Sequence, residues 1–322
     1  MNAPLALSCG EPAGIGPEIA AKAHAALQGE VPFFWIGDPR HLPTGTQSVP
    51  IAAPDECEQA MAHGLPVIVR EFPKPAVPGQ PAPENAAAVI AAIRDAVDLA
   101  QSGSASGIVT GPISKKALID GADFPYPGHT EYLSALSGDV PVVMMLACAE
   151  LRVVPATIHI PLSEVPDHLT AENLAQTIRI TQEALIRDFG ITHPRIAVAG
   201  LNPHAGEGGA MGHEEIELIG PTLEALRREG FDLVGPMPGD TMFHADARAG
   251  YDTAVAMYHD QALIPIKTID FAGGVNVTLG LPFVRTSPDH GTAFDIAGTG
   301  RADPTSLMAA LRLAYDMARA RE

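Results

Sequence analysis

Apolar and polar positions along this chain follow two different periods. Seven short apolar runs, rich in β-branched and aromatic residues, are typical of buried strands. They are LALSC (5–9), FFWIG (33–37), ASGIVT (105–110), PVVMMLA (141–147), LRVVPAT (151–157), RIAVAGL (195–201) and TAVAMYH (253–259). Longer segments with apolar residues at helical spacing predict helices over 16–28, 84–101, 130–137, 171–189, 212–229 and 304–321. Strands alternating with helices indicate an α/β fold with a mostly parallel sheet, in which ligands collect beyond the carboxyl ends of the strands.

Composition narrows the class of protein. With 322 residues, of which 46% are hydrophobic and 18% charged, the chain is long enough for one large globular domain or two. The net charge of -18 argues against a nucleic-acid partner, although a few local cations can still form a pocket for an anion. Three scattered cysteines are typical of reduced thiols in the cytoplasm. The pattern contains neither a signal peptide nor an apolar stretch long enough to span a membrane, so we expect a cytoplasmic protein.

Two polar constellations follow predicted strands in the first half of the chain. CGEPAGIGPEIA (9–20) predicts a strand, a Gly/Pro turn and a helix, an arrangement that can present backbone N–H groups to an anion. It lacks the glycine spacing of the GxGxxG dinucleotide fingerprint, and it can equally be a tight turn with Pro17 in the first helical turn. In TGPISKKALIDGADFPYPGHTEYL (110–133), His129 and Thr130 stand at a helix start, where Thr130 could simply be the N-cap.

Three histidines each follow an apolar strand, namely His159, His204 and His259. A parallel sheet would bring residues in that position together, and three imidazoles with open positions suit a catalytic divalent ion. The alternative for each is an ordinary surface or core histidine. Further on, Lys267, Asn276 and Arg285 supply two cations and an amide suited to a phosphate or carboxylate, or else belong to an ordinary loop.

Together these motifs resemble one family. GEPAGIGPE, TGPISK, GHTEYL, MMLACAELRV, GLNPHAGEGGAMGHEE, AMYHDQ and GVNVTLGLPFVRTSPDHGTA, in this order, resemble the 4-hydroxythreonine-4-phosphate dehydrogenase family of vitamin B6 synthesis. The resemblance extends from about residue 6 to the C-terminus. It implies two α/β/α subdomains similar to those of isocitrate and isopropylmalate dehydrogenases. We expect the first to comprise 1–128 plus 288–322, on the cofactor side, and the second 129–287, on the metal, substrate and dimer side, with the active site in the cleft between.

The resemblance also assigns roles to residues of this chain. His159, His204 and His259 match the ligands of a divalent metal (Zn, Mg or Co), one of them donated across a homodimer and expected to be His259. His129, Thr130, Lys267, Asn276 and Arg285 match the residues that hold the substrate. Asp240 and Asp260 match aspartates near the metal and, with Lys267, are the candidate catalytic residues. For the cofactor, NAD or NADP, we assign Gly14, Gly16, Asn276 and Leu279.

The implied reaction is the oxidation of 4-phosphohydroxy-L-threonine to a 3-keto acid, which loses CO₂ to give 3-amino-2-oxopropyl phosphate. Ser114 stands where many members have a histidine, and Asp270 stands where a neutral residue is common. These differences leave open relatives that act on threonate or erythronate 4-phosphate or on a terephthalate cis-dihydrodiol. Two other classes are a zinc hydrolase, since three histidines also activate water, and a non-catalytic phosphate-binding protein, which would not explain the histidines.

Overall fold

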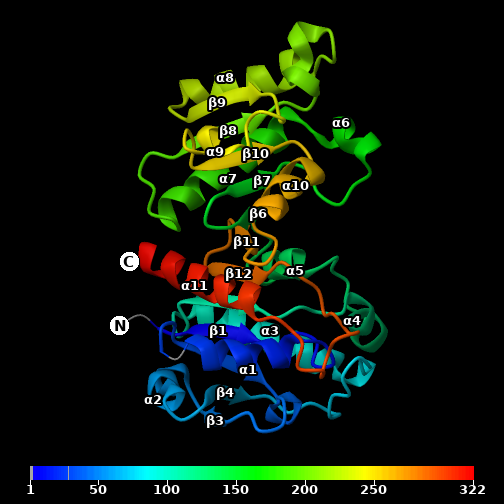
Figure 1. Ribbon diagram of the computed structural model, residues 1–322, viewed down its shortest axis with the longest axis vertical. Helices are drawn as coiled ribbons and strands as arrows, with labels where there is room; N and C mark the ends of the chain where they lie inside the picture. Colours follow the sequence, from blue (N-terminus) through cyan, green and yellow to red (C-terminus); the bar gives the residue numbers. More distant parts are fainter. Residues whose placement is uncertain (1–2, 28) are drawn as a thin grey trace. The chain divides into compact units, whose positions relative to one another are not determined.

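The computed structural model describes residues 3–27 and 29–322, and the chain divides into two compact units (Figure 1). Unit 1 comprises Met1–Pro141 and Leu281–Glu322, and unit 2 comprises Val142–Gly280. The expected boundaries fell at 128/129 and 287/288. They differ because the helix at 129–136 packs against another helix of unit 1, and the strand at 284–288 pairs with a strand of unit 1.

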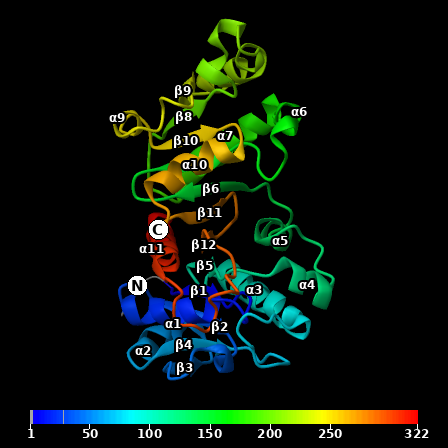
Figure 2. The same ribbon diagram turned by 45° about the vertical axis from the view of Figure 1, so that its right-hand side comes forward.

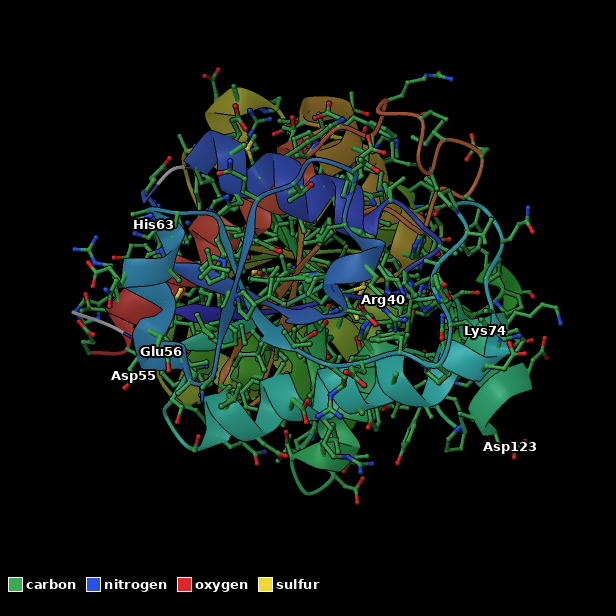
Figure 3. The ribbon with its side chains drawn as sticks, turned by 90° about the horizontal axis from the view of Figure 1, so that it is seen from below. Arg40, Asp55, Glu56, His63, Lys74 and Asp123 are labelled. Carbon is green, nitrogen blue, oxygen red and sulfur yellow. The ribbon has the colours of Figure 1, made fainter. Side chains whose placement is uncertain are left out.

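Unit 1 is a parallel sheet with helices on both faces. Its strands are β1 (Leu5–Ser8), β2 (Phe33–Gly37), β3 (Ser48–Ile51), β4 (Leu65–Val69), β5 (Gly107–Thr110) and β12 (Val284–Pro288). Its helices are α1 (Gly16–Leu27), α2 (Cys57–Met61), α3 (Ala86–Gln101), α4 (Lys115–Ala122), α5 (His129–Leu136) and α11 (Thr305–Ala320), with 3₁₀ turns at Pro39–His41, Pro54–Glu56 and Pro83–Asn85. The strand order is β3-β4-β2-β1-β5-β12, and every pair is parallel. Figure 3 shows α1 on one face of these strands and α3 on the other.

Unit 2 has a mixed sheet. Its strands are β6 (Val143–Ala147), β7 (Arg152–Pro155), β8 (Arg195–Ala199), β9 (Asp232–Met237), β10 (Thr253–Ala256) and β11 (Val275–Leu279). Its helices are α6 (Val165–His168), α7 (Ala171–Arg187), α8 (Gly220–Arg228), α9 (Ala245–Arg248) and α10 (His259–Ile269). A 3₁₀ turn lies at Leu162–Glu164 and a π-helical turn at Glu215–Ile219, while the tight turns at Pro203–Gly209 have positive φ at residues 204–208. The order is β11-β6-β7-β10-β8-β9, parallel from β7 to β9, while β6 runs antiparallel to both neighbours.

The predicted α/β class and all seven predicted strands are confirmed, and each predicted helix corresponds to an observed one. The predicted end of the first helix, residue 28, lies outside the described residues. The helix expected over 212–229 begins only at 215, with a π-helical turn that leads into α8. Five strands were not predicted, and neither were the helices α2, α4, α6, α9 and α10.

The segment around His259 corrects one prediction. The strand expected over 253–259 ends at Ala256, and His259 is the first residue of α10, which lies across the strands of unit 2 (Figure 2). The polar residues at 259–261 and Pro265 conceal the helical pattern, yet Ala262, Leu263 and Ile266 are buried at helical spacing. β10 therefore brings His259 to the carboxyl ends of the strands, and α10 carries Lys267 in its last turn.

Candidate functional site

Three neighbouring parallel strands of unit 2 carry the histidines at their carboxyl ends. β7, β10 and β8 lie side by side, and they are followed by His159, His259 and His204 respectively. The rings of His159 and His259 lie 5.7 Å apart between centroids, with an angle of 44° between their planes. Among the described residues, no three His, Cys, Asp or Glu side chains form a group that could hold a metal ion. The structure therefore brings two of the three imidazoles together, and His204 lies exposed on its own loop.

The two candidate aspartates differ in their surroundings. Asp260 Oδ1 lies 2.7 Å from Nδ1 of His259, so a proton on Nδ1 would bridge the two groups. This contact leaves Nε2 of His259 as the nitrogen with a lone pair for a ligand bond, which is the arrangement that carboxylates produce behind metal-bound histidines. Asp240 is exposed in the loop after β9, and its carboxylate forms no hydrogen bond or ion pair with another described residue.

Two candidate substrate residues, Lys267 on α10 and Asn276 on β11, belong to unit 2. Lys267 is partly buried, and its Nζ lies 5.7 Å from the centroid of the exposed Phe271 ring. Asn276 lies in β11, and its Oδ1 is buried without a hydrogen-bond donor among the described residues. Because buried polar atoms are usually hydrogen-bonded, this oxygen is suited to accept a hydrogen bond from a ligand. Leu279, on the same strand, is buried in the core.

A cationic cluster occupies unit 1. Arg285 on β12 is only 3% exposed, and its Nη2 donates to Thr110 Oγ1 over 2.7 Å. Burial lowers the pKa of Arg285 to about 10, while the nearby Glu131 carboxylate acts in the opposite direction. The guanidinium therefore remains charged at neutral pH, although it is buried.

His129 lies next to that guanidinium, at the start of α5. Its Nε2 is buried and has no hydrogen-bond partner among the described residues. Burial lowers the pKa of His129 well below its usual value, and the charges of Arg285 and Lys115 lower it further. The imidazole is thus neutral at pH 7. The N-cap of α5 is Gly128, so Thr130 is not the cap that its position allowed.

Lys115 and Glu131 also belong to this cluster. Neither was predicted from the sequence to be a ligand. A Cβ placed on Gly128 would lie 3.8 Å from Lys115 Nζ and 3.4 Å from Glu131 Oε2, so both side chains reach the start of α5. Ser114 caps α4, since its Oγ accepts a hydrogen bond from the Ala117 N–H over 3.3 Å. The one signal for Lys115 was its place directly after the strand-end sequence TGPIS.

The Gly/Pro turns after β1 and β5 pack against each other. Glu11 N–H donates to the Pro112 carbonyl over 2.8 Å, and a Cβ on Gly10 would lie only 2.4 Å from that oxygen. Glu11 itself is 3% exposed, and burial raises the pKa of its carboxyl group. Gly16 allows the start of α1 to pack closely on the end of β1, because a Cβ there would lie 2.7 Å from the Cys9 carbonyl oxygen.

A cavity in unit 1 runs along α1, with a volume of about 1340 Å³. Its walls come from α1, the segments 40–47, 58–64 and 76–78, and the loop 298–300. Arg40 and His63 both belong to this wall, and Figure 3 shows that they come from different segments of the chain. Of the four residues predicted to bind the cofactor, only Gly14 lines it.

Two polar side chains in this wall have defined partners. Lys22 Nζ, on α1, donates to the carbonyls of Gly300 and Ala302 over 2.8 and 2.6 Å and so ties the 298–302 loop to the helix. His41 is 8% exposed, and its Nε2 lies 3.2 Å from the Lys74 carbonyl, while its Nδ1 is buried and has no partner in the part of the chain that the structure describes. The Nε2 contact requires a proton there, so Nδ1 presents a lone pair.

Comparison with known proteins now decides the family. Residues 30–314 match the family described as pyridoxal phosphate biosynthetic protein PdxA. The chain belongs to the PdxA family. A 4-hydroxythreonine-4-phosphate dehydrogenase from Paracoccus denitrificans (strain Pd 1222) is 63% identical over 320 residues, covering 98% of each chain.

Solved structures agree with the PdxA assignment. A crystal structure of 4-hydroxythreonine-4-phosphate dehydrogenase from Klebsiella pneumoniae superposes with a TM-score of 0.90 at 39% identity, covering 99% of this chain and 98% of that one. A crystal structure of a terephthalate 1,2-cis-dihydrodiol dehydrogenase from Burkholderia xenovorans LB400 superposes with a TM-score of 0.68 at 30% identity, covering 98% of each chain. A β-decarboxylating dehydrogenase from Thermococcus kodakarensis, 15% identical with a TM-score of 0.51, covers 98% of this chain and 83% of its own, and shows a shared fold alone.

The PdxA assignment accounts for the motifs and leaves the roles of individual residues as predictions. The matched segment includes every candidate metal and substrate residue, from His129 to Arg285. No helix among the described residues is long and apolar enough to cross a membrane.

Proposed function

We propose that this chain is an NAD(P)-dependent 4-hydroxythreonine-4-phosphate dehydrogenase that acts in pyridoxal phosphate biosynthesis. The observation that carries the proposal is the 63% identity to a protein of that name over nearly the whole of both chains. When bound, the nicotinamide cofactor would supply the acceptor for a hydride from the carbon that bears the substrate hydroxyl, and the hydroxyl proton would be released. The resulting ketone is β to the carboxylate, so CO₂ can leave to give 3-amino-2-oxopropyl phosphate.

The substrate is proposed to be held by His129, Thr130, Lys267, Asn276 and Arg285. The cluster in unit 1 supports this, because Arg285 and Lys115 carry positive charge beside a neutral His129 whose Nε2 has no partner among the described residues. Arg offers a planar fork that matches a phosphate group, and a neutral imidazole adds one directional hydrogen bond. An anionic substrate, such as one that carries a phosphate group, therefore suits this cluster better than an uncharged one.

The metal is proposed to be held by His159, His204 and His259. The fit rests on two adjacent imidazoles and on Asp260, which contacts Nδ1 of His259 and leaves Nε2 for the metal. Imidazole donors favour zinc or cobalt over magnesium, and a bound divalent ion would lower the pKa of the substrate hydroxyl. Asp240 has no described partner, so its carboxylate is available to take up the released proton. Lys267 is proposed to hold its positive charge beside the substrate as the substrate becomes anionic.

The cofactor, NAD or NADP, is proposed to occupy the cavity along α1. The cavity is larger than the roughly 300–1,000 Å³ usual for a drug-sized ligand, as an extended dinucleotide requires. Gly14, in its wall, lets a ligand approach the backbone closely, and the unpartnered Nδ1 of His41 can accept a hydrogen bond from it. The earlier assignments of Gly16, Asn276 and Leu279 to the cofactor remain predictions, and the packing of Gly16 on Cys9 gives it another sufficient role.

One second candidate is favoured by an observation. The 30% identity to a terephthalate cis-dihydrodiol dehydrogenase over 98% of both chains makes a diol a possible substrate class for this fold. The threonate and erythronate phosphates would use the same cationic cluster. We therefore propose a comparison of all four compounds, with NAD⁺ and with NADP⁺, by the rate of reduced nicotinamide formation.

The expected result is the highest kcat/KM for 4-phosphohydroxy-L-threonine, with loss of activity in excess chelator and recovery on addition of Zn²⁺ or Co²⁺. The highest value for the cis-dihydrodiol would establish the second candidate instead. Full activity in chelator would remove the metal from the proposal. Turnover without any nicotinamide nucleotide would point to a zinc hydrolase, and phosphate binding without turnover would point to a phosphate-binding protein.

A further inference from the structure

The loop that carries His204 has an unusual backbone. After β8, residues 204–208 all adopt positive φ, between 43° and 80°, and Gly209 continues the run at 98°. His204, Ala205 and Glu207 carry a Cβ, which clashes with the following carbonyl group in this left-handed form. Successive residues of this kind persist only where the surrounding structure holds them. The loop therefore needs a partner outside itself.

A buried carboxylate is that partner. Glu215 is 4% exposed and opens the π-helical turn at Glu215–Ile219. Its Oε1 accepts a hydrogen bond from the Asn202 backbone N–H over 2.8 Å, and its Oε2 accepts one from Asn202 Nδ2 over 3.0 Å. Both contacts lie two residues before His204. Among the described residues, no Lys or Arg forms an ion pair with Glu215, so these neutral donors compensate for its burial.

The glycines of the loop fit around this carboxylate. A Cβ on Gly206 would lie 2.6 Å from Glu215 Oε2, and one on Gly200 would lie 2.9 Å from Oε1. A Cβ on Gly212 would lie 2.3 Å from Asn202 Nδ2. Three glycines thus leave the space that Glu215 and Asn202 fill. Glu214 adds a further bond, because its Oε2 accepts from Asn202 Nδ2 over 2.7 Å.

We infer that Glu215 is a positioning residue, whose buried carboxylate holds the left-handed 202–212 loop through Asn202 and so fixes the place of His204 as a metal ligand. The inference rests on the metal role of His204 in the proposed function. A buried acid next to a loop of strained residues would otherwise be a poor choice, because an apolar side chain could fill the same space at a lower cost of desolvation. π-Helical turns also occur frequently at functional sites.

The test combines metal affinity with a double-mutant cycle. The affinity for Zn²⁺ is measured on metal-free protein by competition with a chelator, for wild type, Glu215→Gln, His204→Ala and the double variant. We expect Glu215→Gln to weaken binding about 10- to 100-fold, the usual effect of losing a group that orients a ligand. In the His204→Ala background the same change should have an effect of no more than about twofold, because the residue acts through His204. Glu217→Gln, an exposed change in the same π-helical turn, is the matched control and should leave the affinity unchanged.

Two outcomes of the cycle would overturn the inference. One is an affinity of Glu215→Gln within about twofold of wild type, and the other is an equal loss in both backgrounds, which would indicate general destabilisation. Asn202→Ala removes the side-chain donor and keeps the backbone one, so it replaces Glu215→Gln in the cycle if that variant does not fold.

Hydrogen exchange on the metal-free wild-type protein gives a test that needs no variant. The amides of Ala205 and Met211, which donate to the Asn202 and Gly206 carbonyls over 3.1 Å each, should be protected before metal is added. Protection that appears only with Zn²⁺ would show that the metal organises the loop and would overturn the inference. A wild-type protein that binds no Zn²⁺ would contradict the metal part of the proposed function. In that case faster exchange of these amides in Glu215→Gln than in wild type would still support the role of Glu215, and equal exchange would overturn it.

Discussion

Single residues in unit 1 show how burial sets chemistry. Arg285 is buried and the nearby His129 is half-buried with its Nε2 shielded from water, but burial affects the charge of the two groups differently. The guanidinium keeps its charge because its pKa falls only to about 10, whereas the pKa of the imidazole falls well below its usual value. The result is one fixed cation beside one neutral hydrogen-bonding group. The sequence allowed each residue to be predicted as a substrate ligand, but their different charge states depend on burial and on Lys115, which no local pattern reveals.

Arg285→Lys is expected to raise the KM for a phosphorylated substrate about 10- to 100-fold, because a charge-assisted hydrogen bond contributes roughly 1.5–3 kcal/mol and each 1.4 kcal/mol is tenfold in affinity. Lysine keeps the charge but cannot reach Thr110 and a phosphate at once with a planar fork. Steady-state kinetics would check this, with Arg312→Lys, an exposed pair with Glu30, as control. An unchanged KM would remove Arg285 from the proposed substrate site.

The neutral His129 predicts a dependence of stability on pH. Its pKa in the folded protein is lower than in the unfolded chain, where it is about 6.5. As the pH falls through that value, the unfolded state takes up a proton first, so the free energy of unfolding decreases, by at most about 1.4 kcal/mol per pH unit for this group. His129→Gln should therefore lose less stability than wild type between pH 7.5 and 5.5.

Urea unfolding at both pH values measures this difference. His63→Gln, at an exposed position, is the control and should retain the wild-type slope. His41 and His24 also have pKa values lowered by burial, so some dependence on pH will remain in the His129→Gln variant. A slope identical to that of wild type would show that His129 is protonated alike in both states.

At the scale of elements, apolar runs are predictable and polar strands are not. The seven predicted strands are short runs of mostly buried residues, and hydrophobic pattern alone identifies them. β11 and β12 were not predicted as strands because VNVTL and VRTSP contain Asn, Thr, Arg and Pro, although most of their side chains are buried. Those same polar residues, Asn276 and Arg285, are candidates for the substrate site. Function thus interrupts the pattern from which the strands would be predicted.

α1 offers a test of the cavity as the cofactor site. Ala25 and Ala26 are both exposed near the end of this helix, but only Ala25 lines the cavity. Ala25→Trp places a large ring in the cavity, so the KM for the nicotinamide cofactor should rise by about tenfold or more, while Zn²⁺ affinity stays unchanged. Ala26→Trp makes the same change outside the cavity and should behave as wild type. Equal cofactor KM values for the two variants would place the cofactor elsewhere.

At the scale of the whole molecule, sequence resemblance identified the family, while the described residues of one chain bring only two of the three candidate metal ligands together. Topology explains why three strand-end histidines share an edge, and the sequence pattern was sufficient for that expectation. It could not reveal that His204 lies on a loop with positive φ, because no local pattern marks the contacts between that loop and Glu215. Nor does any pattern in a single chain identify ligands that come from a second one.

A homodimer with a shared site predicts complementation between inactive variants. His204→Ala and His259→Ala should each be inactive alone, but a mixture unfolded and refolded together should regain about a quarter of wild-type activity, because half of the dimers are mixed and one of their two sites is intact. This holds if the two histidines of one site come from different subunits. Recovered NAD(P)⁺ reduction measures it, with separately refolded variants combined afterwards as the control.

The same assay identifies the subunit that donates each ligand. If His259 crosses the interface, as the family resemblance implies, His159→Ala and His259→Ala should also complement each other. If the 5.7 Å approach of these two rings within one chain is the working arrangement, that pair should stay inactive while His204→Ala complements either. Failure of all three pairs would place every ligand of a site in one chain. Dilution of the wild type below its dimer dissociation constant should then leave turnover per chain unchanged, whereas a shared site requires it to vanish.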